Sequence, residues 1–268
     1  MIVLGSAACG ADSGGSAPTA SSASSSTVTT APLSLSFTLE GVEGLAPREE
    51  PQLTRSSDDE TISVWSSTAG ITDAYIVLRD VPAPPHKSPE GDISVVPMEV
   101  PSGTAFIATD NGVGEPAPTS ATRVMWWRSD GRLWIVSNFG VAPDRLAALT
   151  LEIQPGSGVP FVLPDPTMTF IGMSSLTIYE SARQGWGLDG SNIGLAVTTG
   201  GLAQQLDVPT VAVAERTIAG AAGYELTLAN GQLNMIWPTA NPDRWGSLIV
   251  SSPLAARVDE IVSAIVAR

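Results

Sequence analysis

The chain has 268 residues, of which 43% are hydrophobic and 15% are charged, so it can bury a sizeable core in one large domain or two ordinary ones. Its 13 Lys and Arg residues stand against 27 Asp and Glu residues, which gives a formal net charge of −14. Such a surface repels phosphate backbones and anionic lipid, so the charge argues against nucleic acid as a partner.

The head of the chain, residues 1–9, is a short apolar segment that runs into small residues before a cysteine. It resembles the lipobox of bacterial lipoproteins, with Ser6 where that family usually has an aliphatic residue. We interpret it as a truncated signal, since the basic region and most of the apolar region are missing. The resemblance implies that Cys9 is lipidated and holds the protein at the extracytoplasmic face of the cell membrane. A free, inert thiol at Cys9 is the alternative.

Residues 10–32 consist almost entirely of Gly, Ser, Ala, Thr and Pro, and Asp12 is their only charge. This composition cannot bury apolar area and predicts a disordered, flexible tether. The rest of the sequence contains no run of about 18 apolar residues, the length that a membrane-spanning helix requires. We therefore expect membrane attachment through the lipid alone.

From residue 33 onward, short apolar runs rich in Val, Ile, Trp and Thr alternate with Gly, Pro, Asn and Asp. This pattern is typical of antiparallel strands joined by turns. The predicted strands are residues 33–39, 62–65, 74–78, 104–109, 123–127, 133–137, part of 168–179, 193–198, 210–214, 224–228 and 233–237.

An internal similarity relates residues 124–136 to residues 224–236, with a spacing of 100 residues. Each segment has two apolar runs around an Asp-Gly or Asn-Gly pair, at 130–131 and 230–231. These pairs favour tight hairpin turns, because Asn, Asp and Gly tolerate positive φ. The similarity predicts two related hairpins, although a chance match between two common turns remains an alternative.

A helical pattern follows each hairpin, at residues 143–149 in the first copy and 254–266 in the second, where the apolar residues form one stripe. We therefore predict an α+β fold, a tandem of two similar units, each an antiparallel sheet with a hairpin followed by a helix packing on the sheet. The units span residues 33–155 and 160–268, joined by a Pro-rich link at 159–166. The pattern is faintly similar to repeat modules of actinobacterial extracytoplasmic envelope and sigma-factor-regulatory proteins, and it transfers no functional residue.

Few residues in the sequence fit a catalytic or metal site. The single histidine, His86, lies in a Pro-rich stretch that would not hold an imidazole rigidly as a general base. One His and one Cys cannot supply the nitrogen and sulfur ligands of a zinc site. The carboxylates of 58–60 form the densest acidic run, which we interpret as a solvated loop. We therefore expect no catalytic, metal-binding or cofactor-binding residue and no cofactor.

Two further patterns in the sequence are candidates for ligand sites. Residues 185–190 are Gly-rich but contain Asp189, which would repel a phosphate. Several tryptophans could present a platform for sugar rings, but core packing is the simpler interpretation for most of them. They are Trp126, Trp127, Trp134, Trp186, Trp237 and Trp245.

Three hypotheses of function follow from the sequence. The first is a non-catalytic envelope lipoprotein that binds another protein, as a sensor or an assembly accessory. The second is a carrier or binder of a lipid or glycan, and a carrier would need a cavity lined by side chains such as Val77, Ile107, Ile135 and Ile236. The third is a hydrolase that uses carboxyl groups alone. The sequence leaves the partner, the ligand and the oligomeric state open.

Overall fold

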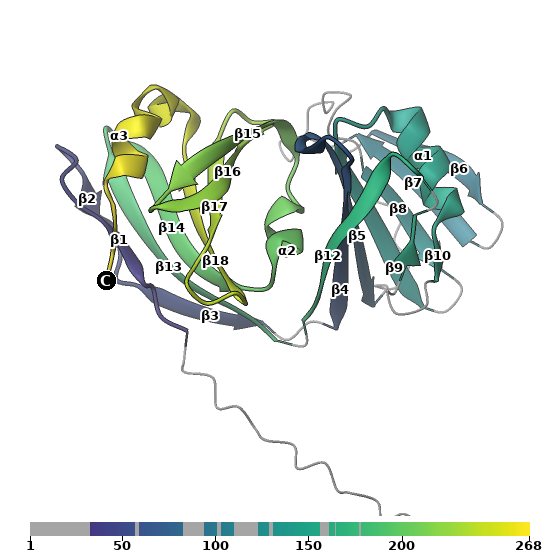
Figure 1. Cartoon of the computed structure of the whole chain (residues 1–268), viewed down its shortest axis with the longest axis horizontal. Helices are drawn as coiled ribbons and strands as arrows, with labels where there is room; N and C mark the ends of the chain where they lie inside the picture. Colours follow the sequence, from purple (N-terminus) through teal and green to yellow (C-terminus); the bar gives the residue numbers. More distant parts are fainter. Residues whose placement is uncertain are drawn as a thin grey trace, which may run out of the picture. The chain divides into compact units, whose positions relative to one another are not determined.

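The computed structural model describes residues 33–56, 59–82, 94–100, 103–109, 123–128, 131–155, 161–163, 165–176 and 178–268. Most of these residues lie in strands, and every pair of adjacent strands in the two large sheets is antiparallel (Figure 1). The helical elements are short: α1 (Pro143–Glu152), α2 (Leu202–Leu206), a 3-10 helix (Ser252–Arg257) and α3 (Val258–Ser263). None of the helices in these described ranges is long and apolar enough to cross a membrane.

The first sheet has seven strands, several of which are strongly buried. Strands β4 and β5 carry apolar residues on both faces, because each face is covered by other elements. In spatial order the strands are β12 (Met168–Leu176), β4 (Glu60–Ser67), β5 (Gly70–Pro82), β9 (Arg132–Phe139), β8 (Arg123–Arg128), β7 (Gly103–Thr109) and β6 (Ser94–Val100).

The second sheet has eight strands, seven of them in its main order. They are β15 (Thr210–Ile218), β16 (Ala221–Leu228), β17 (Leu233–Pro238), β18 (Arg244–Val250), β14 (Ser191–Thr199), β13 (Tyr179–Leu188) and β2 (Ala46–Pro47), with β3 (Gln52–Ser56) also paired to β13. Two small sheets pair β1 (Phe37–Leu39) with β19 (Ile265–Ala267) and β10 (Gln154–Pro155) with β11 (Phe161–Val162).

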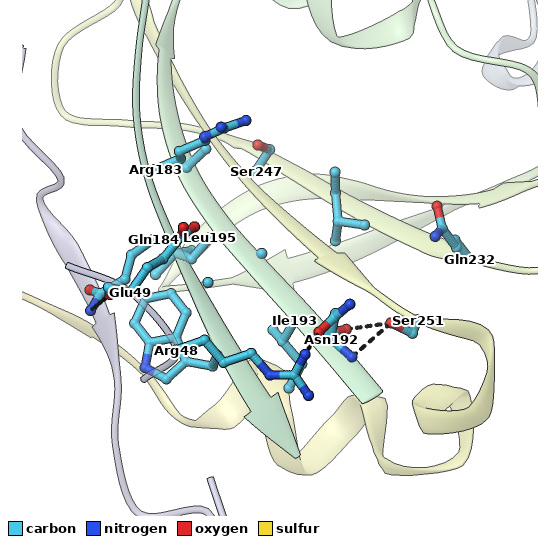
Figure 2. Close-up of a pocket in the computed structure, with 15 residues that line it drawn as sticks. Arg48, Glu49, Arg183, Gln184, Asn192, Ile193, Leu195, Gln232, Ser247 and Ser251 are labelled. Carbon is cyan, nitrogen blue, oxygen red and sulfur yellow. Dashed lines mark hydrogen bonds between the residues drawn. The ribbon is translucent and has the colours of Figure 1, made fainter. Parts of the chain in front are cut away.

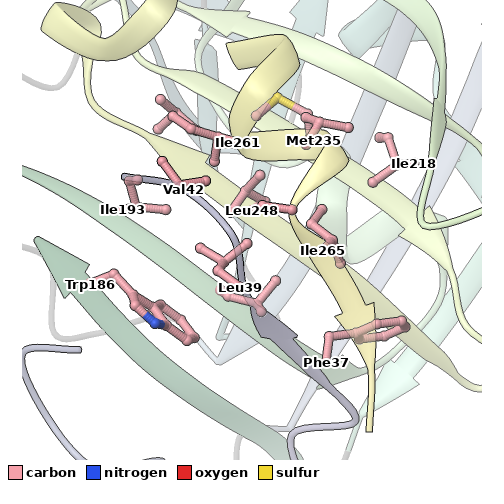
Figure 3. Close-up of a cluster of buried hydrophobic side chains, with 14 of the residues drawn as sticks. Phe37, Leu39, Val42, Trp186, Ile193, Ile218, Met235, Leu248, Ile261 and Ile265 are labelled. Atoms are coloured by element: carbon pink, nitrogen blue, oxygen red, sulfur yellow. The ribbon is translucent and has the colours of Figure 1, made fainter. Parts of the chain in front are cut away.

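The largest apolar cluster covers one face of the second sheet. Alternate residues of β13, β14, β17 and β18 point to this face and meet residues of β1, α3 and β19 (Figure 3). The Phe37 ring packs edge to face against Trp237, with ring centroids 5.4 Å apart. A corresponding cluster on the first sheet joins Leu146 and Leu149 of α1 to Trp65 and Trp134. The opposite face of the second sheet is therefore left for other contacts.

A third apolar cluster joins the remaining faces of the two sheets. It combines Val64 and Val77 of the first sheet with Leu226 and Ile236 of the second and with Leu206 of α2. Burial of this kind contributes about 25 cal/mol per Å² of apolar surface, so it favours a fixed contact between the sheets.

A polar network borders this contact. Arg79 donates to the Glu60 carboxylate at 2.7 Å and to Asp207 at 3.3 Å. Gln204 of α2 donates to the other Glu60 oxygen at 3.1 Å, and Ser137 donates to Asp207 at 3.1 Å. Charged groups from the first sheet are therefore satisfied by the segment that precedes β15.

The predicted α+β class is wrong, because the structure is mainly β. Its sheets are larger than expected and its helices are too short to form a layer on each sheet. The predicted helix at 254–266 shows the physical reason. It divides into a 3-10 turn, α3 and β19, because the β-branched Ile265 and Val266 pair with Leu39 and Thr38 of β1.

Both predicted hairpins are present in the structure. β8 pairs with β9, and Trp127 opposite Leu133 is the pair nearest the turn. β16 pairs with β17, and Thr227 opposite Leu233 is the pair nearest the turn. Gly131 and Gly231 have φ of 79° and 77°, as such turns require. That the two hairpins belong to a repeat stays a prediction.

Each of the two sheets contains edge strands that come from the part of the sequence that mainly forms the other sheet. β2 and β3 come early in the sequence but pair with β13 of the second sheet, whereas β12 comes after residue 160 and pairs with β4 of the first. The division into units at 33–155 and 160–268 stays a prediction about folding units. The tether at 10–32 lies outside the described residues, as do residues 159, 160 and 164 of the link at 159–166.

Candidate functional site

An open pocket of about 530 Å³ lies on the second sheet, over β13, β14 and β18. It faces away from the large apolar cluster, because the side chains that line its centre alternate with those that enter the cluster. Residues of the loop between β2 and β3 form one wall, and Ile249 contributes an apolar side chain to another. The site therefore combines segments far apart in the sequence.

The floor of the pocket is almost free of side chains. Gly185 and Gly194 are directly opposed on β13 and β14, and Ala196 and Ser247 are directly opposed on β14 and β18. A Cβ atom at Gly194 would meet nothing within 4 Å. Glycine in a strand weakens it and marks places where another group approaches the backbone closely. The floor is therefore open backbone bordered by side chains.

Arg48 and Glu49 cover the β13 side of this floor. A Cβ atom at Gly187 would lie 2.6 Å from the Arg48 Nε, and one at Gly185 would lie 3.2 Å from the Glu49 Oε1. These two glycines thus make room for the two side chains. Arg48 donates to the Asn192 Oδ1, and its backbone N–H donates to the Gly185 carbonyl at 2.9 Å. The Arg48 side chain is therefore held in place.

Three polar side chains around the floor have no hydrogen bond or ion pair with the described residues: Arg183, Ser247 and Gln232. Figure 2 shows them spread along one side of the pocket, with Arg48 and Asn192 on the other. Each other arginine whose side chain is described has a protein partner. Arg183 therefore presents an uncompensated guanidinium in a strongly acidic protein.

One oxygen of a buried glutamine beside the pocket, Gln184, accepts no hydrogen bond from the described residues. Gln184 is 7% exposed, and its Nε2 donates to the Glu49 carbonyl at 3.2 Å. Its Oε1 accepts no hydrogen bond within the described part of the chain. Gln184 shares the face of Ala182 and Trp186 on β13, so this oxygen lies on the opposite side of the strand from the glycine floor.

Charge and hydrogen bonding define what this pocket can do. Arg48 and Arg183 supply two positive charges against the single carboxylate of Glu49, which accepts from Gln52 at 3.0 Å. A guanidinium can donate two parallel hydrogen bonds to a carboxylate or phosphate. The arrangement fits the binding of an anionic, polar ligand.

The interpretation of residues 58–60 as a solvated loop is wrong for Glu60, which begins strand β4. Glu60 is buried and binds Arg79, whereas Asp59 binds Arg132 at 3.1 Å. Adjacent strand residues point to opposite faces, which separates the two carboxylates. Asp58, His86 and Cys9 lie outside the described residues.

The tryptophans with described side chains mostly pack in the core. Trp134, Trp186 and Trp237 are buried, and Trp245 packs against the cluster between the sheets. The side chains of Trp126 and Trp127 lie outside the described part. Of the residues proposed to line a carrier cavity, Val77 and Ile236 are fully buried in the packed contact between the sheets and Ile135 is partly buried. Ile107 has no described side chain.

Sequence reasoning missed this pocket, although a signal was present. Gly185 and Gly187 alternate with Gln184 and Trp186. This two-residue alternation is typical of a strand, and it places both glycines on the same face. The sequence alone shows only a Gly-rich segment at 185–190, where Asp189 argues against phosphate binding. Asp189 lies instead in the turn after β13, where it binds Arg257 at 2.7 Å.

Comparisons with models of protein families, with curated proteins and with solved structures gave no match to this chain. The function is therefore argued from the geometry of the pocket.

Proposed function

We propose that this chain is a non-catalytic binding protein of the cell envelope, whose ligand occupies the pocket on the second sheet. The observation that carries the proposal is Arg183, an unpaired guanidinium above an open glycine floor in a chain of net charge −14. Each other arginine whose side chain is described has a partner within the protein, charged or neutral. An unpaired cation in a pocket is the feature expected where an external anion completes the pairing.

A photo-crosslinking amino acid placed at Ile249 tests this proposal in cells. Ile249 lines the pocket and is 42% exposed. Val266, on β19, is also 42% exposed and does not line this pocket, so it is a matched control position. We expect a specific adduct from position 249 that is absent from position 266. Equal adducts at both positions, or none at either, would contradict the proposal.

We further propose that the protein is anchored to the membrane through a lipid on Cys9. The lipobox-like residues 1–9 and the tether at 10–32 support this part of the proposal. The Cys9→Ala variant, expressed from the native locus, should move from the membrane fraction to the soluble fraction and should lose labelling by a fatty-acid analogue. Unchanged retention in the membrane would refute the anchor.

A protein partner is the second candidate, and a different surface favours it. β12 is the last strand of the first sheet, and Ile171 and Met173 on it are exposed. Exposed apolar side chains on an edge strand favour pairing with another chain. A photo-crosslinker at Met173 should then yield a protein adduct, which an Ile171→Asp substitution should abolish.

A further inference from the structure

We infer that the ligand of the second-sheet pocket is an acidic saccharide, a sugar that carries a carboxylate or a phosphate. This inference rests on the proposed function and deepens it. It joins three observations: the unpaired charge of Arg183, the free polar groups beside it and the position of the pocket in the interior of a sheet.

The charge selects an anionic group. Arg183 forms no ion pair or hydrogen bond with the part of the chain that the structure describes, and Arg48 adds a second guanidinium at the opposite border. Glu49 is the one acid that lines the pocket, and Gln52 binds its carboxylate. A ligand carboxylate or phosphate beside Arg183 would therefore meet a net positive border within an acidic protein.

The position of the pocket disfavours an extended peptide. β14 is paired with β13 and β18, and β18 is paired with β14 and β17. The backbone groups of the floor are therefore used within the sheet, and a peptide main chain would find no free edge to extend. Recognition must come from side chains that rise around the floor.

The side chains around the floor can form hydrogen bonds with the hydroxyl groups of a sugar. The Ser247 hydroxyl and the Gln232 carboxamide offer both donors and acceptors, and neither has a partner among the described residues. Figure 2 places them on the same side of the pocket as Arg183. The glycine floor admits a flat ring close to the backbone, and a volume of about 530 Å³ is within the range of small-ligand sites. A sugar ring with one anionic substituent satisfies the charge and the hydrogen bonds together.

Calorimetric titration of the full chain with defined sugars tests the inference. The probes are a glucuronic-acid-containing disaccharide and its carboxyl-reduced neutral form, and glucose 1-phosphate with glucose as its neutral form. We expect an acidic member to bind at least about tenfold more tightly than its neutral counterpart, because the charge-assisted hydrogen bonds to Arg183 are lost with the charge. The two pairs distinguish carboxylate from phosphate.

Variants separate this site from general electrostatic attraction. Arg183→Ala should weaken binding of the acidic probe about tenfold, and Arg183→Lys should retain part of the affinity. Arg55→Ala is the matched control, because Arg55 is an exposed arginine paired with Glu180 outside the pocket. It should leave binding unchanged.

Two results would overturn the inference. Equal binding of the acidic and neutral probes, or equal losses in Arg183→Ala and Arg55→Ala, would show that the pocket does not recognise the anionic sugar. If no sugar binds but position 249 still yields a specific adduct in cells, the ligand class is wrong and the proposed function stands. If both measurements are negative, both proposals fail.

Discussion

Gly194 lies directly opposite Gly185 across the β13 and β14 ladder, and no atom lies within 4 Å of the place that a Cβ on Gly194 would take. A glycine inside a strand costs about 0.5–1 kcal/mol relative to alanine. At Gly185 the carboxylate of Glu49 fills the space, but at Gly194 the space is open. No neighbouring group in the structure therefore requires glycine at position 194. We infer that glycine is present there because it keeps the floor of the pocket open.

A Gly194→Val substitution should abolish ligand binding while the protein stays folded. Valine suits a strand, and its methyl groups would fill the floor of the pocket. We expect the midpoint of thermal unfolding to be unchanged or raised, and the adduct from a photo-crosslinker at Ile249 to disappear. A folded Gly194→Val protein that still gives the full adduct would show that the floor is not part of the site.

The Gly246→Ala substitution should be far more damaging than Gly194→Ala. A Cβ atom at Gly246 would overlap the indole of Trp237, which is fully buried in the largest apolar cluster. The ring would have to move, and overpacking of this kind costs about 1–3 kcal/mol or more. Urea unfolding of the two variants measures the difference. Similar stabilities would mean that Trp237 can shift without cost.

Strands were predicted well where side chains alternate around an apolar core. The runs that contain Val64, Val77, Leu195 and Met235 were all recognised, because their burial pattern is visible in sequence. β13 was missed, since Gly and polar residues occupy the face that forms the pocket. The candidate site thus lies where the local pattern is weakest.

The pairing between distant segments could not be predicted from the sequence. The join between β1 and β19 brings Thr38 opposite Val266, and nothing local in either segment specifies that partner. Similarly, Arg48 reaches Asn192 only because β2 joins the edge of β13. Both the fold class and the pocket depend on such long-range register, which one sequence does not contain.

Removal of Arg79 should destabilise the contact between the sheets. Glu60 is 4% exposed, and Arg79→Leu would leave its carboxylate buried without a cation. The Arg79 side chain is 36% exposed and Gln204 would still donate to Glu60, so we expect a cost of about 1–3 kcal/mol, below that of a fully buried pair. Urea unfolding should show this loss, and the double variant with Glu60→Gln should recover part of it. An equal loss in the single and double variants would contradict this account.

A Tyr75→Phe substitution should be neutral or stabilising by up to about 1 kcal/mol. The Tyr75 hydroxyl is buried near Thr210 but makes no hydrogen bond of normal geometry with the residues that the structure describes. Burial raises the pKa of Tyr75, Thr210 opposes this, and the Asp207 carboxylate adds to it, so the hydroxyl stays neutral. Thermal unfolding checks the prediction. A loss above about 1 kcal/mol would show that the hydroxyl is hydrogen-bonded to Thr210 in solution.

The Asp165 carboxylate should make the free energy of unfolding decrease as the pH falls into the acid range. Burial alone would raise the pKa of the Asp165 carboxyl, but it accepts from the Thr167 N–H at 2.9 Å, from the Thr167 hydroxyl at 2.7 Å and from Arg145 at 2.8 Å. These bonds outweigh burial and hold the pKa below its usual range. The stabilisation is therefore complete above the unfolded-state value of about 3.9 and is lost as the pH falls through the lower folded-state value.

The Asp165→Asn variant isolates this contribution. At pH 7 it should lower the free energy of unfolding by about 1–2 kcal/mol, because the charge-assisted bonds weaken. Its difference from the wild type should shrink below about pH 4, where the carboxyl of the unfolded state begins to bind a proton that the native carboxyl does not yet bind. Asp243→Asn, at an exposed aspartate, is the control and should have little effect at any pH. A difference that stays constant from pH 7 to pH 2.5 would show that Asp165 acts through its shape rather than its charge.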